Sequence, residues 1–210
     1  WVGTSTGLSQ YKNGRFISYA LKDESGNKEV KPIHAIAEAR DGSLWFGLFG
    51  GGLNRLKDGA LTAYTVKDGL SNDFIYAIHE DRDGNLWIGT LVGLNRFRNG
   101  RFDIYTKKDG LSNDYAYAIT EDHEGSLWVG TGGEDGLNQF RDGKFLTYAA
   151  REGLADGRVW SIVEGRGGRL WIGAEGGLSQ FEDGKITAYA NKEFLVNKMI
   201  RCVYESRDES

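Results

Sequence analysis

An all-β fold made of five repeated units is the architecture that this sequence predicts, on three observations. Glycine is frequent at 31 residues and proline occurs once, while Trp, Tyr and Phe number 6, 10 and 10, which favours short strands and tight turns. Each unit carries a G-L-[NS]-[RQ] step followed by an Asn-Gly or Asp-Gly turn, the strongest short-range hairpin signal. A W-[VFI]-G stretch also begins, at intervals of 41 to 44 residues, at Trp1, Trp45, Trp87, Trp128 and Trp171.

The third unit shows how one repeat folds. Its alternating apolar residues predict four strands, at about 74–80, 85–90, 93–97 and 101–106. A period near 40 residues with four strands is typical of a propeller blade, and no segment leaves room for a helix of ten residues. We therefore predict an all-β fold, a single β-propeller domain over residues 1–210 with five four-stranded antiparallel blades. The blades are expected at residues 1–20 with 199–210, 33–65, 74–106, 115–149 and 158–190.

The two ends of the chain match as parts of one blade. Residues 199–205 resemble the first strand of a unit, as in residues 75–80, and Trp1 supplies the second strand that should follow. We therefore expect the C-terminal strand to complete the N-terminal blade and close the ring, leaving no long exposed edge. More blades in a longer protein, or pairing with a second copy, stay open as alternatives. Because the chain opens on Trp1 rather than Met, we expect a piece of a longer precursor or an engineered chain.

Bulk composition excludes several classes of function. The net charge of −4 gives no basic surface for nucleic acid or for an anionic membrane. Cys202 is the single cysteine, so there is no internal disulfide. No apolar run is long enough to span a membrane. The composition is that of an ordinary globular protein, and we expect no cofactor.

The repeated motifs resemble a known family. L-W-[IV]-G-T, G-L-N-R-F, K-D-G-L-S-N-D and A-I-x-E-D-x-x-G-x-L-W together look like the two-component regulator propeller repeat, most densely over residues 66–131. The resemblance covers the whole chain. Two loops depart from the pattern: residues 21–32 carry about three extra residues, and residues 191–198 read Glu193-Phe194-Leu195.

The resemblance implies a role in signalling. Such repeats form the extracytoplasmic sensor of bacterial membrane receptors, often hybrid histidine kinases and sometimes diguanylate cyclases, and several of those receptors respond to oligosaccharides. The family's usual receptor propellers have about seven blades, so five leaves the native number open. No kinase, receiver or DNA-binding module lies in this chain, so it would be the input end of a receptor. We expect it to be periplasmic or extracytoplasmic, in a membrane-anchored parent.

Positions that are alike in all five units are expected to serve the blade. The recurring Trp and the Gly after it are assigned to packing between blades. A glutamate also recurs, and a ring of carboxylates could hold a metal or move protons. We favour a hydrogen bond that ties the turn between strands 1 and 2 to the neighbouring blade. The recurring residues are Glu38, Glu80, Glu121, Glu164 and Glu205.

One position differs in every unit and is the first candidate ligand site. It lies in the innermost strand, two residues before a recurring Ile or Val, near the end fed by the long loops. Aromatic rings there could stack on the apolar face of a sugar while His and Arg donate hydrogen bonds. Plugging of the channel, or packing between blades, is an equal alternative. The residues are His34, Tyr76, Tyr117, Trp160 and Arg201.

The connecting loops form a second, weaker candidate. Binding residues concentrate on loops that a rigid scaffold holds. However, K-D-G-L-S-N-D is mainly turn chemistry, with Gly for positive φ, Asn and Asp as caps and Leu70 or Leu111 as an anchor. The polar residues that stay open for ligand binding are Asp73, Asp114, Asp156, Glu134 and Asp135.

No catalytic or metal-binding constellation is apparent. Residues 81–85 resemble a calcium loop only faintly, and a turn is favoured. The three histidines lack ligand spacing, and no nucleophile motif occurs. A non-catalytic, ligand-binding sensor with a small-molecule or oligosaccharide ligand is the first hypothesis. The alternatives are a protein-interaction scaffold that could form homo-oligomers, an engineered or fragment propeller, and an enzyme similar to the streptogramin lyases, for which no acid/base pair is found.

Overall fold

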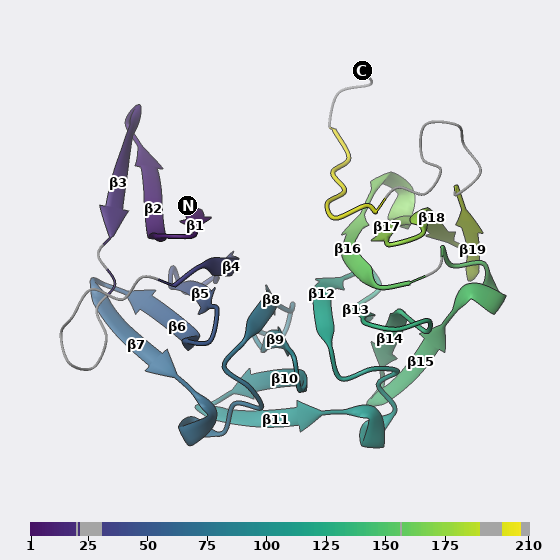
Figure 1. Ribbon diagram of the computed structural model, residues 1–210, viewed down its shortest axis with the longest axis horizontal. Helices are drawn as coiled ribbons and strands as arrows, with labels where there is room; N and C mark the ends of the chain where they lie inside the picture. Colours follow the sequence, from purple (N-terminus) through teal and green to yellow (C-terminus); the bar gives the residue numbers. More distant parts are fainter. Residues whose placement is uncertain (20, 22–30, 156, 190–198, 207–210) are drawn as a thin grey trace. The chain divides into compact units, whose positions relative to one another are not determined.

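The computed structural model describes residues 1–19, 21, 31–155, 157–189 and 199–206. They contain five antiparallel sheets whose strands follow one another in chain order (Figure 1). We name the sheets blades 1 to 5. The chain divides into two compact units, residues 1–91 with 95–104 and residues 92–94 with 105–210. The prediction of a single domain remains untested.

The strands agree with the predicted units. Those predicted for the third unit at 74–80, 85–90, 93–97 and 101–106 lie at 75–80, 86–90, 93–98 and 101–105.

Blade 1 holds β1 (Val2–Thr4), β2 (Gly7–Lys12) and β3 (Arg15–Tyr19). Blade 2 holds β4 (Ile33–Glu38), β5 (Leu44–Leu48), β6 (Gly52–Lys57) and β7 (Ala60–Tyr64). Blade 3 holds β8 (Ile75–Glu80), β9 (Leu86–Thr90), β10 (Gly93–Arg98) and β11 (Arg101–Tyr105). Blade 4 holds β12 (Ala116–Glu121), β13 (Leu127–Thr131), β14 (Leu137–Arg141) and β15 (Lys144–Tyr148). Blade 5 holds β16 (Val159–Glu164), β17 (Leu170–Ala174), β18 (Gly177–Glu182) and β19 (Lys185–Ala188).

The helical segments of the described chain are single 3-10 turns. They are η1 (Val66–Asp68), η2 (Lys107–Asp109), η3 (Ala150–Glu152) and η4 (Arg166–Gly168). None of the helices in the described part of the protein has the length and apolarity needed to cross a membrane. The hairpin between the third and fourth strands is tight because Asp58 and Gly59, like their equivalents in the other blades, both have positive φ, as a type I′ turn requires.

Tryptophan and glycine hold neighbouring blades together, as predicted. Trp45 of blade 2 packs against Phe97 of blade 3 with ring centroids 5.6 Å apart, and Trp128 of blade 4 packs against Phe181 of blade 5 at 4.6 Å. The glycine after the tryptophan permits close approach: a Cβ on Gly130 would come within 2.6 Å of Val159 Cγ1. The repeated motif is therefore an inter-blade contact.

The recurring glutamate makes the predicted tie between blades. Glu80, at the end of β8, accepts a hydrogen bond of 2.8 Å from the Arg40 backbone N–H in the turn of blade 2. Glu164 does the same for His123 of blade 4 at 2.9 Å. This role is confirmed for both residues. The hydrogen bond between His123 Nδ1 and Glu164 also raises the pKa of the imidazole above 6.5.

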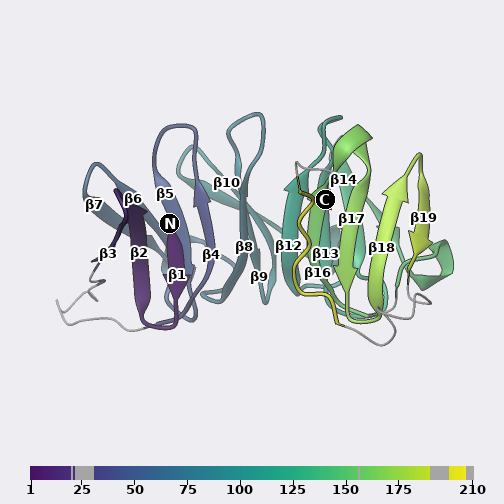
Figure 2. The ribbon, with the colours of Figure 1, turned by 90° about the horizontal axis from the view of Figure 1, so that it is seen from above.

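Residues 199–206 stack on blade 5 in the place of a following first strand. Ile200 donates its N–H to Ala174 and lies where a Cβ on Gly173 would stand. Glu205 accepts from the Arg166 N–H at 3.0 Å, as Glu80 does from Arg40. The segment is not in a strand, and blade 1 has three strands in the described part of the chain, so closure of the ring stays a prediction. Figure 2 shows the strands of each blade from above.

Candidate functional site

The variable position in the first strand is a β-bulge. The pairing of the first strand with the second shifts register across this residue in blades 2 to 5. A bulge leaves its extra residue unpaired and redirects its side chain, and such bulges are frequent beside functional sites. The four bulged residues are those that the sequence comparison selected, His34, Tyr76, Tyr117 and Trp160.

In blades 2 and 3 the bulged residues pack into an aromatic cluster, the blade 2–3 group, made of His34, Phe49, Phe74 and Tyr76. Phe49, directly after β5, lies 4.8 Å from His34, 4.6 Å from Phe74 and 6.4 Å from Tyr76 between ring centroids. His34 also meets Tyr76 edge-on at 5.8 Å. Phe49 thus fills the space between the two bulged residues.

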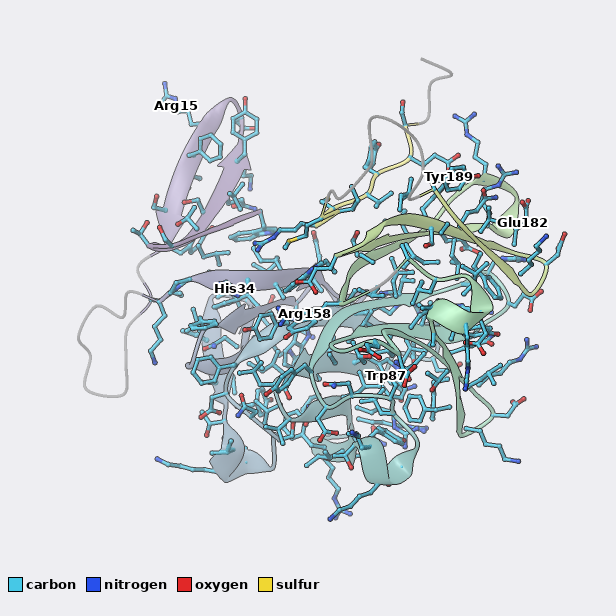
Figure 3. The ribbon with its side chains drawn as sticks, turned by 45° about the vertical axis from the view of Figure 1, so that its right-hand side comes forward. Arg15, His34, Trp87, Arg158, Glu182 and Tyr189 are labelled. Carbon is cyan, nitrogen blue, oxygen red and sulfur yellow. The ribbon has the colours of Figure 1, made fainter. Side chains whose placement is uncertain are left out.

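In blades 4 and 5 the corresponding residues form the blade 4–5 group, made of Tyr115, Tyr117, Arg158, Trp160 and Arg201. Gly132 stands where blade 2 has Phe49. Tyr117 therefore meets Trp160 directly, with centroids 4.6 Å apart and an interplanar angle of 30°. Tyr115 lies 6.3 Å beyond Tyr117 and is 47% exposed. Figure 3 labels His34 from the first group and Arg158 from the second.

Two arginines complete the blade 4–5 group. The Arg201 guanidinium lies 5.3 Å from the centre of the Trp160 ring and that of Arg158 lies 6.0 Å away, both within reach of a cation–π interaction. The Nη1 of Arg158 lies 3.7 Å from the Oε1 of Glu175. The indole N–H of Trp160 is buried, yet no hydrogen-bond acceptor among the described residues reaches it. The group combines aromatic surface with positive charge and a donor that lacks a partner.

The structure thus brings His34 to Tyr76, and Tyr117 to Trp160 and Arg201. That all five surround one channel mouth stays a prediction. Sequence analysis missed Phe49, Phe74, Tyr115 and Arg158. The last three lie two residues before a bulged residue, and this position also differs among the units, which is the signal that could have identified it.

The acidic loop residues that the sequence offered as weaker ligand candidates lie in different environments. Asp73 and Asp114 accept backbone hydrogen bonds from Val66 at 3.0 Å and from Lys107 at 2.8 Å, so both cap loops. Leu70 and Leu111 are buried as anchors. Glu134 and Asp135 are exposed in the turn between β13 and β14. Asp156 lies outside the described residues. Ligand binding by these acidic residues stays a prediction.

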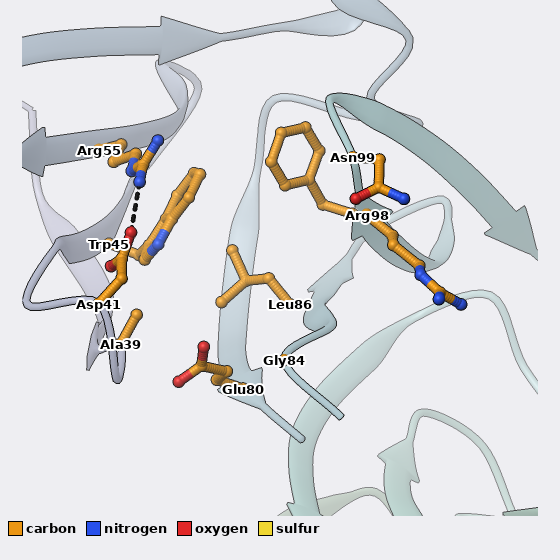
Figure 4. Close-up of a pocket in the computed structure, with 10 residues that line it drawn as sticks. Ala39, Asp41, Trp45, Arg55, Glu80, Gly84, Leu86, Arg98 and Asn99 are labelled. Atoms are coloured by element: carbon orange, nitrogen blue, oxygen red, sulfur yellow. Dashed lines mark hydrogen bonds and ion pairs between the residues drawn. The ribbon is translucent and has the colours of Figure 1, made fainter. Parts of the chain in front are cut away.

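A pocket of about 160 Å³ lies between the recurring Trp45 of blade 2 and the next blade (Figure 4). Asp41 on its wall pairs with Arg55 at 2.6 Å and with Lys57 at 2.8 Å. Hydrogen bonds from Lys57 and Ser43 hold the pKa of the Asp41 carboxyl far below its usual range. A related pocket repeats between blades 1 and 2, lined by Trp1 and Glu38. This repetition marks a feature of blade packing.

Metal chemistry finds little support in what the structure describes. The described residues include no cluster of three or more His, Cys, Asp or Glu side chains that could hold an ion. Asp81, in the segment that faintly resembles a calcium loop, instead accepts hydrogen bonds from the Asn85 N–H at 2.8 Å and from Trp87 Nε1 at 2.7 Å. Its carboxylate therefore stabilises the turn and orients the recurring tryptophan.

Comparison with known families identifies the repeat. Residues 69–91, 110–133 and 153–176 match the two component regulator propeller. Three segments of the chain are thus similar to the two-component regulator propeller repeat. Comparison with curated proteins finds no match.

Solved structures share the fold of this chain. The extracellular domain of BT3049 from B. thetaiotaomicron, whose name describes a hybrid two component system, is 21% identical with a TM-score of 0.81. The alignment covers 99% of this chain and 29% of that chain. The extracellular domain of BT4673 from the same organism is 19% identical over 88% of this chain and 35% of that one, with a TM-score of 0.63. A streptogramin B lyase is 21% identical over 84% and 58%, with a TM-score of 0.67.

At these identities the likeness shows the fold, and the predicted all-β propeller of antiparallel blades is confirmed. The chain spans about a third of the length of these two extracellular domains.

Proposed function

We propose that this chain is the ligand-binding sensor module of a bacterial two-component receptor, located outside the cytoplasm in a membrane-anchored parent, and that it binds an oligosaccharide. The observation that supports the proposal is the bulge that turns an aromatic side chain out of the first strand in blades 3 to 5 and a histidine in blade 2. Aromatic rings held in this way offer flat apolar surface for a sugar ring.

The comparisons support the sensor role more than a catalytic one. Both sensor neighbours are extracellular domains of systems named as two-component. Virginiamycin B lyase from Staphylococcus aureus, an enzyme, shares the fold with a TM-score of 0.68. We therefore propose that the chain acts by binding rather than by catalysis.

Binding would be tested by a thermal-shift screen of the chain against neutral and acidic oligosaccharides, followed by calorimetry. A ligand at a hundredfold excess over its Kd should stabilise the fold by about 2.7 kcal/mol. Trp160→Ala and Tyr117→Ala should remove the shift, whereas Tyr11→Ala, which changes an exposed ring of blade 1, should keep it. A shift that survives both substitutions would refute the site, and no shift from any sugar would refute the function.

A protein-interaction surface is the second candidate function. Tyr11 and Phe16 of blade 1 are 60% and 65% exposed, with ring centroids 5.0 Å apart. Exposed aromatic pairs of this kind often mark interfaces. If this surface mediates self-association, light scattering should report a mass that falls to that of one chain in a Tyr11→Ser, Phe16→Ser double variant.

A further inference from the structure

Arg201 makes no ion pair with a carboxylate among the described residues, in contrast to several other arginines. Arg55 pairs with Asp41 at 2.6 Å and Arg96 with Asp103 at 2.7 Å. The Nε of Arg201 lies 3.2 Å from the Met199 sulfur, a weak acceptor. Its side chain is exposed. The blade 4–5 group therefore holds one positive charge that no carboxylate of the described residues neutralises.

The aromatic ring beneath Arg201 orients its guanidinium. With its Cζ 5.3 Å from the centre of the Trp160 ring, the group is held against the aromatic surface, and Trp160 is in turn backed by Tyr117. A guanidinium carries five N–H donors in a planar fork that matches a carboxylate with two parallel hydrogen bonds. Stacking on an aromatic ring leaves the edge of this fork available to a ligand.

The other polar groups define a direction along the site. The neighbouring Arg158 already has Glu175 at 3.7 Å, so Arg201 supplies the excess positive charge. At the other end of the group, a Cβ on Gly132 would stand 3.3 Å from Tyr115, so Tyr115 borders the glycine that follows β13. The site thus has a positively charged end at Arg201 and continues away from it as a row of aromatic rings.

Trp160 adds a second donor at the arginine end. Its indole N–H is buried without an acceptor, and buried donors in folded proteins nearly always have a partner, a bound molecule included. An acceptor brought by a ligand, or by a water that the ligand holds, would satisfy this donor.

From these observations we infer that the blade 4–5 group selects an acidic oligosaccharide, whose carboxylate binds Arg201 while its sugar rings lie along Trp160, Tyr117 and Tyr115. The inference rests on the proposed function and names the class of its ligand.

Calorimetry with matched acidic and neutral sugars tests this inference on the full chain. The probes are trigalacturonic acid and 3′-sialyllactose, each beside its neutral methyl ester. We expect at least one acid to bind tenfold or more tightly than its ester at low ionic strength. The preference should shrink at 0.5 M NaCl, because salt screens an exposed charge.

Variants of Arg201 separate charge from packing. Arg201→Gln should reduce binding of the acid at least tenfold and leave binding of the ester unchanged, and Arg201→Lys should retain part of the preference because it keeps the charge without the planar fork. Arg101→Gln, which removes an exposed arginine from β11, should change neither affinity.

Two kinds of result would reject the inference, and they differ in whether the proposed function is rejected with it. Equal binding of acid and ester, or an equal loss of both in Arg201→Gln, would overturn the acidic preference while the proposed function survives through the ester. Failure of every acid and every ester to bind would overturn both.

Discussion

The blade 2–3 group and the blade 4–5 group carry their bulged residues at equivalent backbone positions. The space around these residues is filled differently in the two groups. In the blade 2–3 group, Phe49 contacts His34, Phe74 and Tyr76 at centroid distances of 4.6 to 6.4 Å. In the blade 4–5 group, Gly132 replaces that ring, and exposed Tyr115 and Arg201 flank the pair of Tyr117 and Trp160. The repeat thus provides one scaffold, on which the side chain directly after the second strand, Phe49 or Gly132, changes what surrounds the bulged residues.

The largest losses of stability are expected at the glycine two residues after the recurring tryptophan, which packs against the next blade in both regions. Gly47→Ala and Gly130→Ala would each push a Cβ into the next blade, against Ile75 and Val159. Overpacking of this kind costs about 1–3 kcal/mol of unfolding free energy. Urea unfolding should show similar losses for both variants and almost none for Thr62→Ala, an exposed residue of β7. A loss confined to one variant would break the equivalence of the two regions.

A smaller effect is expected at the turn that supports the recurring tryptophan. Asp122 accepts hydrogen bonds from Trp128 Nε1 at 2.7 Å and from the Ser126 N–H at 2.8 Å. Asp122→Ala leaves two buried donors without this acceptor and should cost about 1–3 kcal/mol. Blade 2 has Ala39 at that position, so Ala39→Asp should gain up to about 1 kcal/mol by adding the missing acceptor for Trp45.

Urea midpoints of the two variants measure this difference. A midpoint of Ala39→Asp clearly below that of the wild type would show that the turns of blades 2 and 4 are not equivalent.

The smallest effect is a pH dependence at His123. Its hydrogen bond to Glu164 raises the pKa of the folded state above the usual histidine value of 6.5, so the folded state binds the proton more tightly than the unfolded state. The resulting stabilisation is complete below pH 6.5 and is lost as the pH rises through the folded pKa. Because the imidazole is exposed, the effect is small. The wild-type melting temperature should fall relative to His123→Gln between pH 6 and 8, and parallel curves would contradict this.

The repeats in the sequence were sufficient to predict the blades, because tryptophan spacing and Asn-Gly or Asp-Gly turns report local backbone geometry. They also predicted the role of Glu80 and Glu164, since a residue present in every unit is expected to contact the next unit. The comparison of units selected the variable position, but it could not reveal the bulge, which depends on how two strands pair.

The sequence comparison did not single out Phe49 and Gly132, although each lies four residues after the recurring tryptophan of its blade. Which rings Phe49 contacts depends on how the strands pair, and this is seen only in the structure. Likewise, the sequence offered Asp73 and Asp114 as possible ligand residues, whereas both carboxylates receive backbone N–H groups of their own loops. Closure of the ring depends on contacts between distant segments and stays a prediction.

The most direct test of the account exchanges the residue that distinguishes the two groups. Oligosaccharide binding is measured by calorimetry for Gly132→Phe and Phe49→Ala, with melting curves confirming that both variants fold. The account predicts that Gly132→Phe reduces the affinity at least tenfold, because its side chain would crowd Tyr115, while Phe49→Ala leaves the affinity within twofold of the wild type. Full binding by Gly132→Phe, or loss of binding in Phe49→Ala alone, would contradict it.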